Sequence, residues 1–464
     1  MTAIYIVDDL HPEDNAMVQA LYSRSPASVV EHLDKVRQVG SGKFMEQFYI
    51  GYGHDSIGDC GSTTIFVENV SMLVAKAIQD NAMYSGQEAS TRYLDFSQQT
   101  MVDPYNHPAS SQIQQNWMTL YNETMPVLVE AIKAKHPFDP GAYKTEKAWD
   151  KAAQVRAFDI LRSVLPVGTT TLLSWHTNLR QARAHLRRLH NHPLEEVRTV
   201  ANEIYRGLHE KYKNSLNGEE MDDSSVRYAD RNAYARINAV ADHVLTVEAA
   251  TADLTPEQCA ALKRGEMVVD DSLVAIERIN SKESVALDRP RGAPLDRRLT
   301  KYGTYDMKFL LDFGSFRDLQ RHRNGYCPVP VIGNRYGFYS WYDNELQRLL
   351  PASDYTTFRT KMQQQFDAIA SLPSQGIATD PLRDQYLYPM GMACACELSY
   401  TIPQMVYVAE LRSGATVHAS LRPVAQQMGR VLEKNHPSLR LYVDYSEDSW
   451  SPKRGEQDIT VKVA

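Results

Sequence analysis

The sequence lacks several features that define specialised classes of protein. Its 464 residues contain no run of 18 apolar residues, and the start, Met1 to Asp9, has neither the basic nor the apolar region of a secretory signal. Positive charge is also in deficit, since the formal net charge is -7, whereas broad nucleic-acid binding needs a basic surface. We therefore expect a soluble, cytoplasmic protein that binds neither membrane nor nucleic acid.

Cysteine is scarce and unevenly placed. The odd number and wide scatter of the thiols favour reduced cysteines over a disulfide framework, and no His or Cys spacing is typical of zinc, so no metal is expected. Two of them lie in the apolar run Met390 to Leu398, where small buried hydrophobes are the favoured interpretation over metal ligands. The five are Cys60, Cys259, Cys327, Cys394 and Cys396.

The overall composition is that of a globular protein, with 43% hydrophobic and 23% charged residues, and the length allows two to four domains. The sequence also contains an internal repeat. Val197 to Leu208 matches Leu421 to Leu432 without a gap, at the apolar spacing of an amphipathic helix. Both segments follow a proline-headed apolar run, at Leu165-Pro166 and at Tyr388-Pro389. The chain therefore reads as two diverged copies of one module.

The polar stretch from 213 to 231 has no periodic apolar face and predicts the boundary, giving modules at 1–235 and 236–464. Strands and helices interleave in both, which predicts a mixed α/β or α+β fold. In the first copy, helices are expected at 28–36, 70–78, 116–135 and 149–164, and a strand at 62–67. In the second, we expect an alternating stretch at 239–249, a further element at 281–287, a strand at 305–311 and a helix leading to Arg321.

Two motifs carry the chemistry. Arg321-His322-Arg323 follows the expected helix, and its two arginines can hold phosphate bidentately while the histidine reaches another face. By itself, such a triplet is also typical of a solvated basic helix end. The second motif, far upstream, is Tyr84 to Tyr93 (YSGQEASTRY), and Gly53-His54-Asp55-Ser56 precedes it.

Together these motifs resemble the flavin-dependent thymidylate synthases, which carry Gly-His-x-Ser/Thr, then Arg-His-Arg, then Ser-x-Asn/Gln-Glu-x-Ser-x-Arg-Tyr. Here the pattern is divided between two places. Asp80-Asn81-Ala82 stands where the first copy should have Arg-His-Arg. The second copy keeps the triplet but continues with Gly325 to Pro330 in place of the Glu-x-Ser-x-Arg segment.

The resemblance also implies that residues at fixed distances from Pro166 and Pro389 contact dUMP and flavin. The first copy keeps Arg162, Asn178 and Arg180, whereas the matching positions in the second are Gln385, Thr401 and Pro403.

The arginine that contacts uracil in the family falls at Arg412 in the second copy and at Leu189 in the first, although the neighbouring Arg187 and Arg188 leave that loss open. The losses in the two copies are thus complementary. Independent decay would scatter them, so a composite site with parts from both copies is the favoured hypothesis. The family builds its sites from neighbouring subunits of a tetramer, and we expect a homodimer that forms a pseudo-tetramer.

The resemblance assigns roles to the substrate residues. A nucleotide monophosphate carries nearly two negative charges, so Arg92 and Arg162 would bind the phosphate and Ser90 would fill remaining acceptor sites. Glu88 would accept from a ribose hydroxyl or a flavin group; otherwise it is an exposed carboxylate. Arg412 would stabilise charge on the uracil carbonyls as C5 becomes nucleophilic; otherwise it caps a helix end.

It also assigns roles toward the cofactors. Arg321 and Arg323 would hold FAD or its phosphates, with His322 against the isoalloxazine. Asn178, Arg180, Glu88 and Ser56 would contact the flavin, although Ser56 suits a helix N-cap equally well. His54 would assist folate binding or methylene transfer, unless it is only a turn residue. Asp59-Cys60 stands where the family has Glu-His, which questions one flavin contact.

The predicted function is reductive methylation of dUMP to dTMP with 5,10-methylenetetrahydrofolate and NADPH through bound FAD. Two alternatives remain. One is another flavin-dependent C5 modification of a pyrimidine nucleotide, such as hydroxymethylation; the other is a nucleotide-binding protein that has lost catalysis. Cys327 neighbours Arg323 and could be an activated nucleophile, but between turn-forming segments and before Pro328 it is interpreted as a structural thiol.

Overall fold

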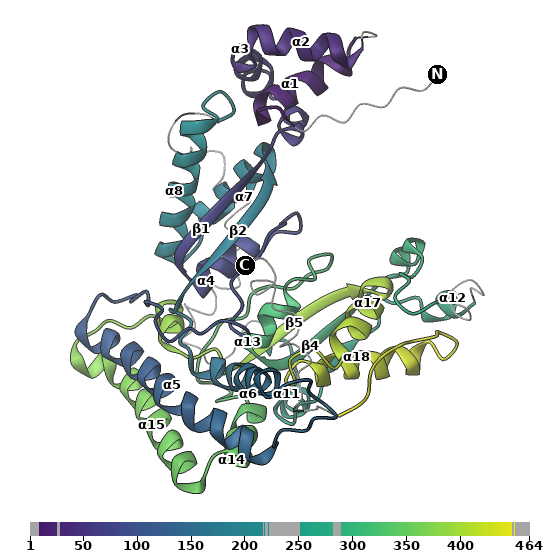
Figure 1. The fold of residues 1–464 in the computed structure, drawn as a ribbon. Helices are drawn as coiled ribbons and strands as arrows, with labels where there is room; N and C mark the ends of the chain where they lie inside the picture. The colour runs from purple at the N-terminus through teal and green to yellow at the C-terminus, as the bar shows by residue number, and fades with distance from the viewer. Residues whose placement is uncertain are drawn as a thin grey trace. The chain divides into compact units, whose positions relative to one another are not determined.

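The computed structural model describes residues 9–25, 28–216, 218, 221, 251–281, 289–447 and 450 (Figure 1). The chain forms two compact units. The first contains Met1–Glu88 and Thr171–Ala239, and the second contains Ala89–Thr170 and Val240–Ala464. This division differs from the predicted modules, whose boundary near 235 lies outside the described residues. Part of the first half of the sequence, residues 89–170, thus folds within the unit that contains the second half.

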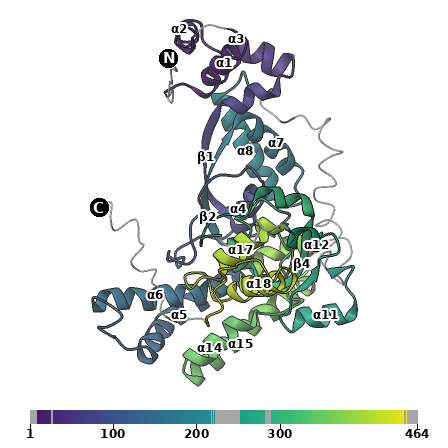
Figure 2. The same ribbon diagram turned by 90° about the vertical axis from the view of Figure 1, so that its right-hand side faces the viewer.

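The first unit joins short N-terminal helices to a two-stranded sheet of β1 and β2. The helices α4, α7 and α8 pack on one another beside these strands (Figure 2). The elements are α1 (Pro12–Tyr22), α2 (Val29–Val39), α3 (Gly42–Phe44), the π-helix η1 (Met45–Gly51), the 3-10 helix η2 (Asp55–Cys60), β1 (Ser62–Ser71), α4 (Met72–Gln79), β2 (Thr170–Asn178), α7 (Leu179–His190) and α8 (Glu195–Lys211).

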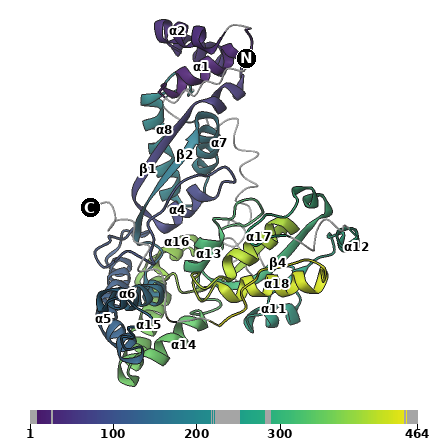
Figure 3. The same ribbon diagram turned by 45° about the vertical axis from the view of Figure 1, so that its right-hand side comes forward.

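The second unit combines a helical group with a three-stranded sheet. The long helix α5 packs against α6, α14 and α15 (Figure 3). The sheet is antiparallel in the order β3-β4-β5, with Tyr305 opposite Tyr400. Its main elements are α5 (Pro108–Lys135), α6 (Glu146–Leu161), β3 (Val268–Asp270), β4 (Thr304–Asp312), α13 (Phe313–Leu319), α14 (Ser340–Leu349), α15 (Ala352–Ser371), β5 (Ala393–Thr401), α17 (Ile402–Ser413) and α18 (Arg422–Asn435).

Shorter elements complete the second unit. They are η3 (Arg162–Val164), α11 (Pro256–Lys263), α12 (Ile276–Asn280), η6 (Arg297–Tyr302), η7 (Leu372–Gln375), α16 (Pro381–Asp384) and η8 (Gln385–Leu387).

The same elements recur in both halves at a fixed spacing. Strand β2 begins at Thr170 and β5 at Ala393, while α7 begins at Leu179 and α17 at Ile402, so both pairs are 223 residues apart (393 − 170). Upstream, a strand followed at once by a helix also occurs twice, as β1–α4 and β4–α13. This order is what a duplicated module predicts.

The two proline-headed segments pair with each other inside the second unit. Pro166 and Pro389 form an antiparallel bridge. The Val167 amide donates to the Tyr388 carbonyl at 2.9 Å, and Met390 donates to Leu165 at 2.9 Å. The Gly168 amide reaches Tyr386 at 3.0 Å, while Gly391 reaches Ser163 at 2.8 Å. The bonds are reciprocal at the 223-residue spacing, as two copies of one segment related by a pseudo-two-fold axis would make them.

Side chains at the ends of strands start the helices that follow. Asp312, the last residue of β4, accepts from the Ser315 amide at 2.8 Å and caps α13. Asn178 does the same for α7 through the Gln181 amide, also at 2.8 Å. A short polar side chain at this position satisfies one of the free amides of the first helical turn. The chain therefore turns directly from strand into helix, and the cap fixes where each helix begins.

Most expected elements are confirmed. Helices predicted at 28–36, 70–78 and 149–164 correspond to α2, α4, and α6 with η3, and the strands at 62–67 and 305–311 lie in β1 and β4. The helix predicted at 116–135 is α5, which begins eight residues earlier, at Pro108. The mixed fold class is confirmed. The helix expected to lead to Arg321 ends at Leu319, so the triplet follows it. The stretch 239–249 and most of 281–287 lie outside the described residues.

Burial agrees with the interpretation of the cysteines. Cys394 and Cys396 lie in β5 with exposed fractions of 0% and 1%, and Cys327 is also buried. None of the five cysteines, all of which lie in the described ranges, forms a disulfide bond. Among the helices in the described ranges, none has both the length and the apolar content to cross a bilayer.

The reciprocal proline pairing predicts a local sensitivity to added volume. In Gly391→Ala the new methyl would lie 2.5 Å from the Phe338 ring and 2.7 Å from the Ser163 carbonyl, so the backbone has to move. We expect a loss of about 1–3 kcal/mol in the free energy of unfolding, measured by urea denaturation. Gly333→Ala is the control, because no heavy atom lies within 4 Å of its new methyl. Equal stability of the two variants would contradict the close approach.

Candidate functional site

The predicted site residues divide between the two compact units. Most of the substrate residues fall in the second unit, together with the Arg-His-Arg triplet, whereas the first unit holds the remaining cofactor candidates. The second unit carries Ser90, Arg92, Arg162, Arg321, His322, Arg323 and Arg412. The first carries His54, Ser56, Glu88, Asn178 and Arg180.

A carboxylate near the end of α13, Asp318, marks where the second-unit residues converge. Burial by itself would raise the pKa of Asp318. The guanidiniums of Arg92, Arg162, Arg321 and Arg412 outweigh burial and lower that pKa to about 2. Opposite charges act this way only at short range. Arginines from both sequence copies therefore surround one carboxylate.

Arg321 is the most accessible of these four. Its Nε lies 3.8 Å from Asp318 Oδ1, and its side chain is 47% exposed while that of Asp318 is 15% exposed. The other carboxylate oxygen, Oδ2, is buried and accepts no hydrogen bond from the described residues. The exposed guanidinium of Arg321 and the unbonded Oδ2 of Asp318 next to it make this a place where a polar, anionic molecule could bind.

Arg412 at the end of α17 is held against the triplet. Its Nε donates to His322 Nε2 at 2.7 Å, and its Nη2 donates to the Asp318 carbonyl at 2.8 Å. Burial, followed by the charge of Arg412, lowers the pKa of His322 to about 3. The imidazole is therefore neutral near pH 7.

Arg92 and Ser90 follow the Glu88 position on one short loop. Arg92 makes a two-point ion pair with Asp159, at 2.6 and 3.0 Å, and its side chain is 12% exposed. The Ser90 hydroxyl accepts from the Arg92 amide at 3.3 Å. The guanidinium is thus oriented by Asp159 while still acting on Asp318.

Arg162, a predicted phosphate contact, is almost completely buried. Its side chain is 2% exposed and contacts three partners: Tyr342 at 3.2 Å, Ser315 at 2.8 Å and the carboxylate of Asp312 at 3.7 Å. In these contacts it neutralises the residue that caps α13. The role of Arg162 toward phosphate stays a prediction.

Two residues that the motif analysis did not single out belong to this cluster. Asp318 is one. Arg317 is the other: it is buried, and its guanidinium donates to the Thr91 hydroxyl at 3.3 Å and to the Ala89 carbonyl at 3.5 Å, holding the loop that carries Ser90. Their signal in the sequence is the spacing, since they lie three and four residues before Arg321, in the last turn of the helix that the triplet follows.

In the first unit, Glu88 is buried and paired. Its Oε2 lies 2.8 Å from Lys76 Nζ and accepts from Gln79 Nε2 at 2.9 Å, with the Lys76 and Glu88 side chains 0% and 2% exposed. A buried charge needs such compensation. The exposed-carboxylate interpretation is therefore wrong, and the role of Glu88 toward ribose or flavin stays a prediction.

Three other cofactor candidates surround the start of α7. Asn178 caps that helix. Arg180 pairs with Asp59 at 2.6 Å. Asp59 is part of the departure from the family pattern, so the altered residue now binds a predicted flavin contact. Ser56 is exposed in η2 and does not serve as the N-cap of that helix, because His54 holds that position without a side-chain cap.

His54 lies in an aromatic group of the first unit. Its ring stacks on Phe48, with centroids 6.4 Å apart, and approaches Tyr52 at 6.0 Å. Its Nδ1 is buried and has no hydrogen-bond partner among the described residues. The role of His54 toward folate or methylene transfer stays a prediction.

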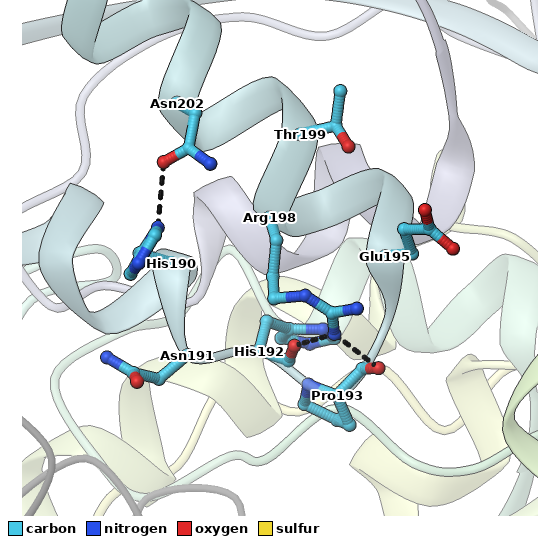
Figure 4. A pocket seen from close by; sticks show the side chains of 8 residues that line it. All are labelled: His190, Asn191, His192, Pro193, Glu195, Arg198, Thr199 and Asn202. Carbon is cyan, nitrogen blue, oxygen red and sulfur yellow. Dashed lines mark hydrogen bonds between the residues drawn. The ribbon is translucent and has the colours of Figure 1, made fainter. Parts of the chain in front are cut away.

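Two pockets lie near these elements. One, of about 600 Å³, lies where α7 ends and α8 begins, and is lined by His190 of α7, His192 of the turn and Asn202 of α8 (Figure 4). Arg198 at this turn is bound to the carbonyls of His192 and Pro193. No predicted site residue lines it. Within the described ranges, no group of three or more His, Cys, Asp or Glu side chains is arranged to hold a metal ion.

The second pocket, of about 300 Å³, lies along α17 in the second unit. Tyr407 lines it and also meets the His322 ring edge-on, with centroids 5.7 Å apart. This pocket therefore adjoins the triplet.

Comparison with known proteins finds one family and several relatives. Residues 6–212, somewhat less than half of the chain, are similar to the family described as thymidylate synthase complementing protein. Over both halves the chain is similar to a UPF0159 protein of Chlamydia muridarum, with 24% identity over 455 residues that cover 87% of this chain and 81% of the relative. A UPF0159 protein of Thermoplasma acidophilum is 22% identical over 488 residues, covering 92% and 94%.

The arginines around Asp318 predict a pH-dependent contribution to stability. Because the folded pKa, about 2, lies below the value of about 3.9 in an unfolded chain, the ionised carboxylate stabilises the fold above pH 4, and the contribution is lost as the pH falls towards 2. Asp318→Asn should therefore cost roughly 2 kcal/mol at pH 7 and progressively less below pH 4. Urea denaturation at several pH values measures the difference. Asp367→Asn, an exposed carboxylate on α15, is the control. An equal cost at pH 7 and pH 3 would contradict the interpretation.

Proposed function

We propose that the protein is a flavin-dependent thymidylate synthase, which converts dUMP to dTMP with 5,10-methylenetetrahydrofolate as carbon donor and NADPH as reductant. The observation that carries this proposal is the convergence on Asp318. Arg92 comes from one sequence copy, Arg321 and Arg412 come from the other, and all three lower the pKa of the same carboxylate. Neither copy has this set alone.

The charges of the cluster suit a nucleotide monophosphate. Asp159 balances Arg92, and Asp318 partly balances Arg321 and Arg412. A net positive charge remains among these five groups, on a partly exposed surface. A phosphate with nearly two negative charges would complete the balance through charge-assisted hydrogen bonds. Arg92 and Arg321 are the proposed contacts, with Ser90 beside them.

Arg412 is the proposed electrostatic catalyst. It is already oriented by two protein contacts, and its pKa is lowered because the guanidinium is partly removed from water. A charge held in such an environment interacts more strongly with developing negative charge than it would in water. Directed at the uracil carbonyls, it would favour the nucleophilic form of C5.

The second unit also suits an anionic flavin cofactor. Arg321 and Arg323 supply cations near the aromatic ring of His322, a donor set that fits a pyrophosphate and a ring system. When bound, FAD would supply the transfer of two electrons from the reductant. In the first unit, His54, Ser56, Glu88, Asn178 and Arg180 are proposed contacts for cofactors. We further propose a homodimer as the working assembly.

The activity test is direct. The purified protein should absorb as a flavoprotein, form dTMP from dUMP, and rescue a bacterium that requires thymidine. Mass spectrometry of the nucleotide product separates methylation from hydroxymethylation, which the altered Asp59 region leaves as the second candidate. A colourless protein that binds dUMP without turnover would instead indicate a binding protein.

Replacing the proposed catalyst should affect turnover more than binding. Arg412→Ala is expected to lower kcat by about 10²–10³-fold, the usual effect of removing one preorganised donor. Arg430→Ala, an exposed arginine on α18 of the same unit, is the control and should retain activity. Steady-state kinetics with dUMP measures both. A normal kcat in Arg412→Ala would contradict the assignment.

A further inference from the structure

We infer that His322 is a positioning residue, whose Nε2 lone pair fixes the orientation of the Arg412 guanidinium. This inference rests on the proposed function, because it concerns how the catalyst of that reaction is held. It gives the central residue of the triplet a task that the sequence motif does not indicate.

The hydrogen bond between Arg412 and His322 has only one possible direction. A guanidinium carries donors only, so Nε donates the proton at 2.7 Å and His322 Nε2 accepts it. An imidazole nitrogen that accepts carries no proton. His322 is therefore the neutral tautomer protonated at Nδ1, which agrees with its lowered pKa of about 3.

Two contacts leave one edge of the guanidinium available. Nε is held by His322, and Nη2 is held by the Asp318 carbonyl at 2.8 Å. Nη1 donates to no acceptor within the described part of the chain. Because the guanidinium is planar, two fixed nitrogens determine the direction of the third. Arg412 therefore presents Nη1 in a set direction to a ligand.

The His322 ring is itself restrained. It is 8% exposed, and Tyr407 meets it edge-on at 5.7 Å with an interplanar angle of 76°. Protonation of His322 would remove the acceptor and place a cation beside Arg412, Arg321 and Arg323, against the single negative charge of Asp318. The surroundings thus hold the ring in one orientation and in its neutral form.

The matching place in the first copy shows why a neutral acceptor matters. Counting from the starts of α4 and α13, Asp80 matches Arg321 and Asn81 matches His322. There Arg188 donates to the Asp80 carbonyl and forms an ion pair with the Asp80 carboxylate at 2.9 Å. A carboxylate partner neutralises the arginine. A neutral imidazole orients the arginine and leaves its charge available to the substrate.

The experiment compares substitutions that keep or remove the acceptor. His322→Gln retains an amide oxygen at about the reach of Nε2, whereas His322→Phe keeps a ring without an acceptor. We expect His322→Phe to lower kcat by at least about 10-fold with a smaller change in KM, and His322→Gln to recover most of that loss. His436→Gln is the matched control, because His436 is also buried in the second unit and its Nε2 is hydrogen-bonded, to Tyr305.

A measurement without turnover tests the contact itself. In full-length wild-type protein, nitrogen NMR of the His322 ring at pH 7 should show Nδ1 protonated and Nε2 bare, and Arg412→Ala should change the Nε2 shift. A protonated Nε2 would overturn the inference, and so would normal kcat in His322→Phe. If wild-type protein forms no dTMP, the proposed function fails, and the ring tautomer still decides whether His322 holds Arg412.

Discussion

The arrangement of the second unit depends on the charge balance around Asp318. One buried carboxylate near the end of α13 meets arginines delivered by the loop after Glu88, by η3, by the triplet and by α17. Without the acid, these cations would repel one another at short range. With it, they are held close enough for a single anionic molecule to contact more than one of them.

The positive charge of each arginine has different partners, and these partners distinguish an arginine that stabilises the core from one that is available to a ligand. Arg162 is enclosed by Asp312, Tyr342 and Ser315, and its charge is used to stabilise the core. Arg412 is held by a neutral ring and a carbonyl. Cations whose partners are uncharged keep their electrostatic reach, so Arg412 has more charge to offer a ligand than Arg162.

Site residues could be predicted from the sequence where they form a recognisable motif, and less well where their partners come from distant segments of the chain. The repeat spacing correctly paired β2 with β5 and α7 with α17, and the divided motif pointed to Arg92 and Arg321 as members of one cluster. Asp318 was not identified because an acid beside basic residues is common in any sequence. The buried ion pair of Glu88 was not predicted, because its partner, Lys76, lies in an apolar helix where a lysine gives no pairing signal.

The reciprocal bonds at Pro166 and Pro389 have an evolutionary consequence. In an assembly of separate identical chains, contacts of this kind would weaken on dilution, and any mutation would alter both sides at once. Here the two partners are tethered in one polypeptide, so their effective concentration does not depend on how much protein the cell makes. Each side can also change alone, and the two copies do differ, with Asp80-Asn81-Ala82 in one at the place of the triplet in the other.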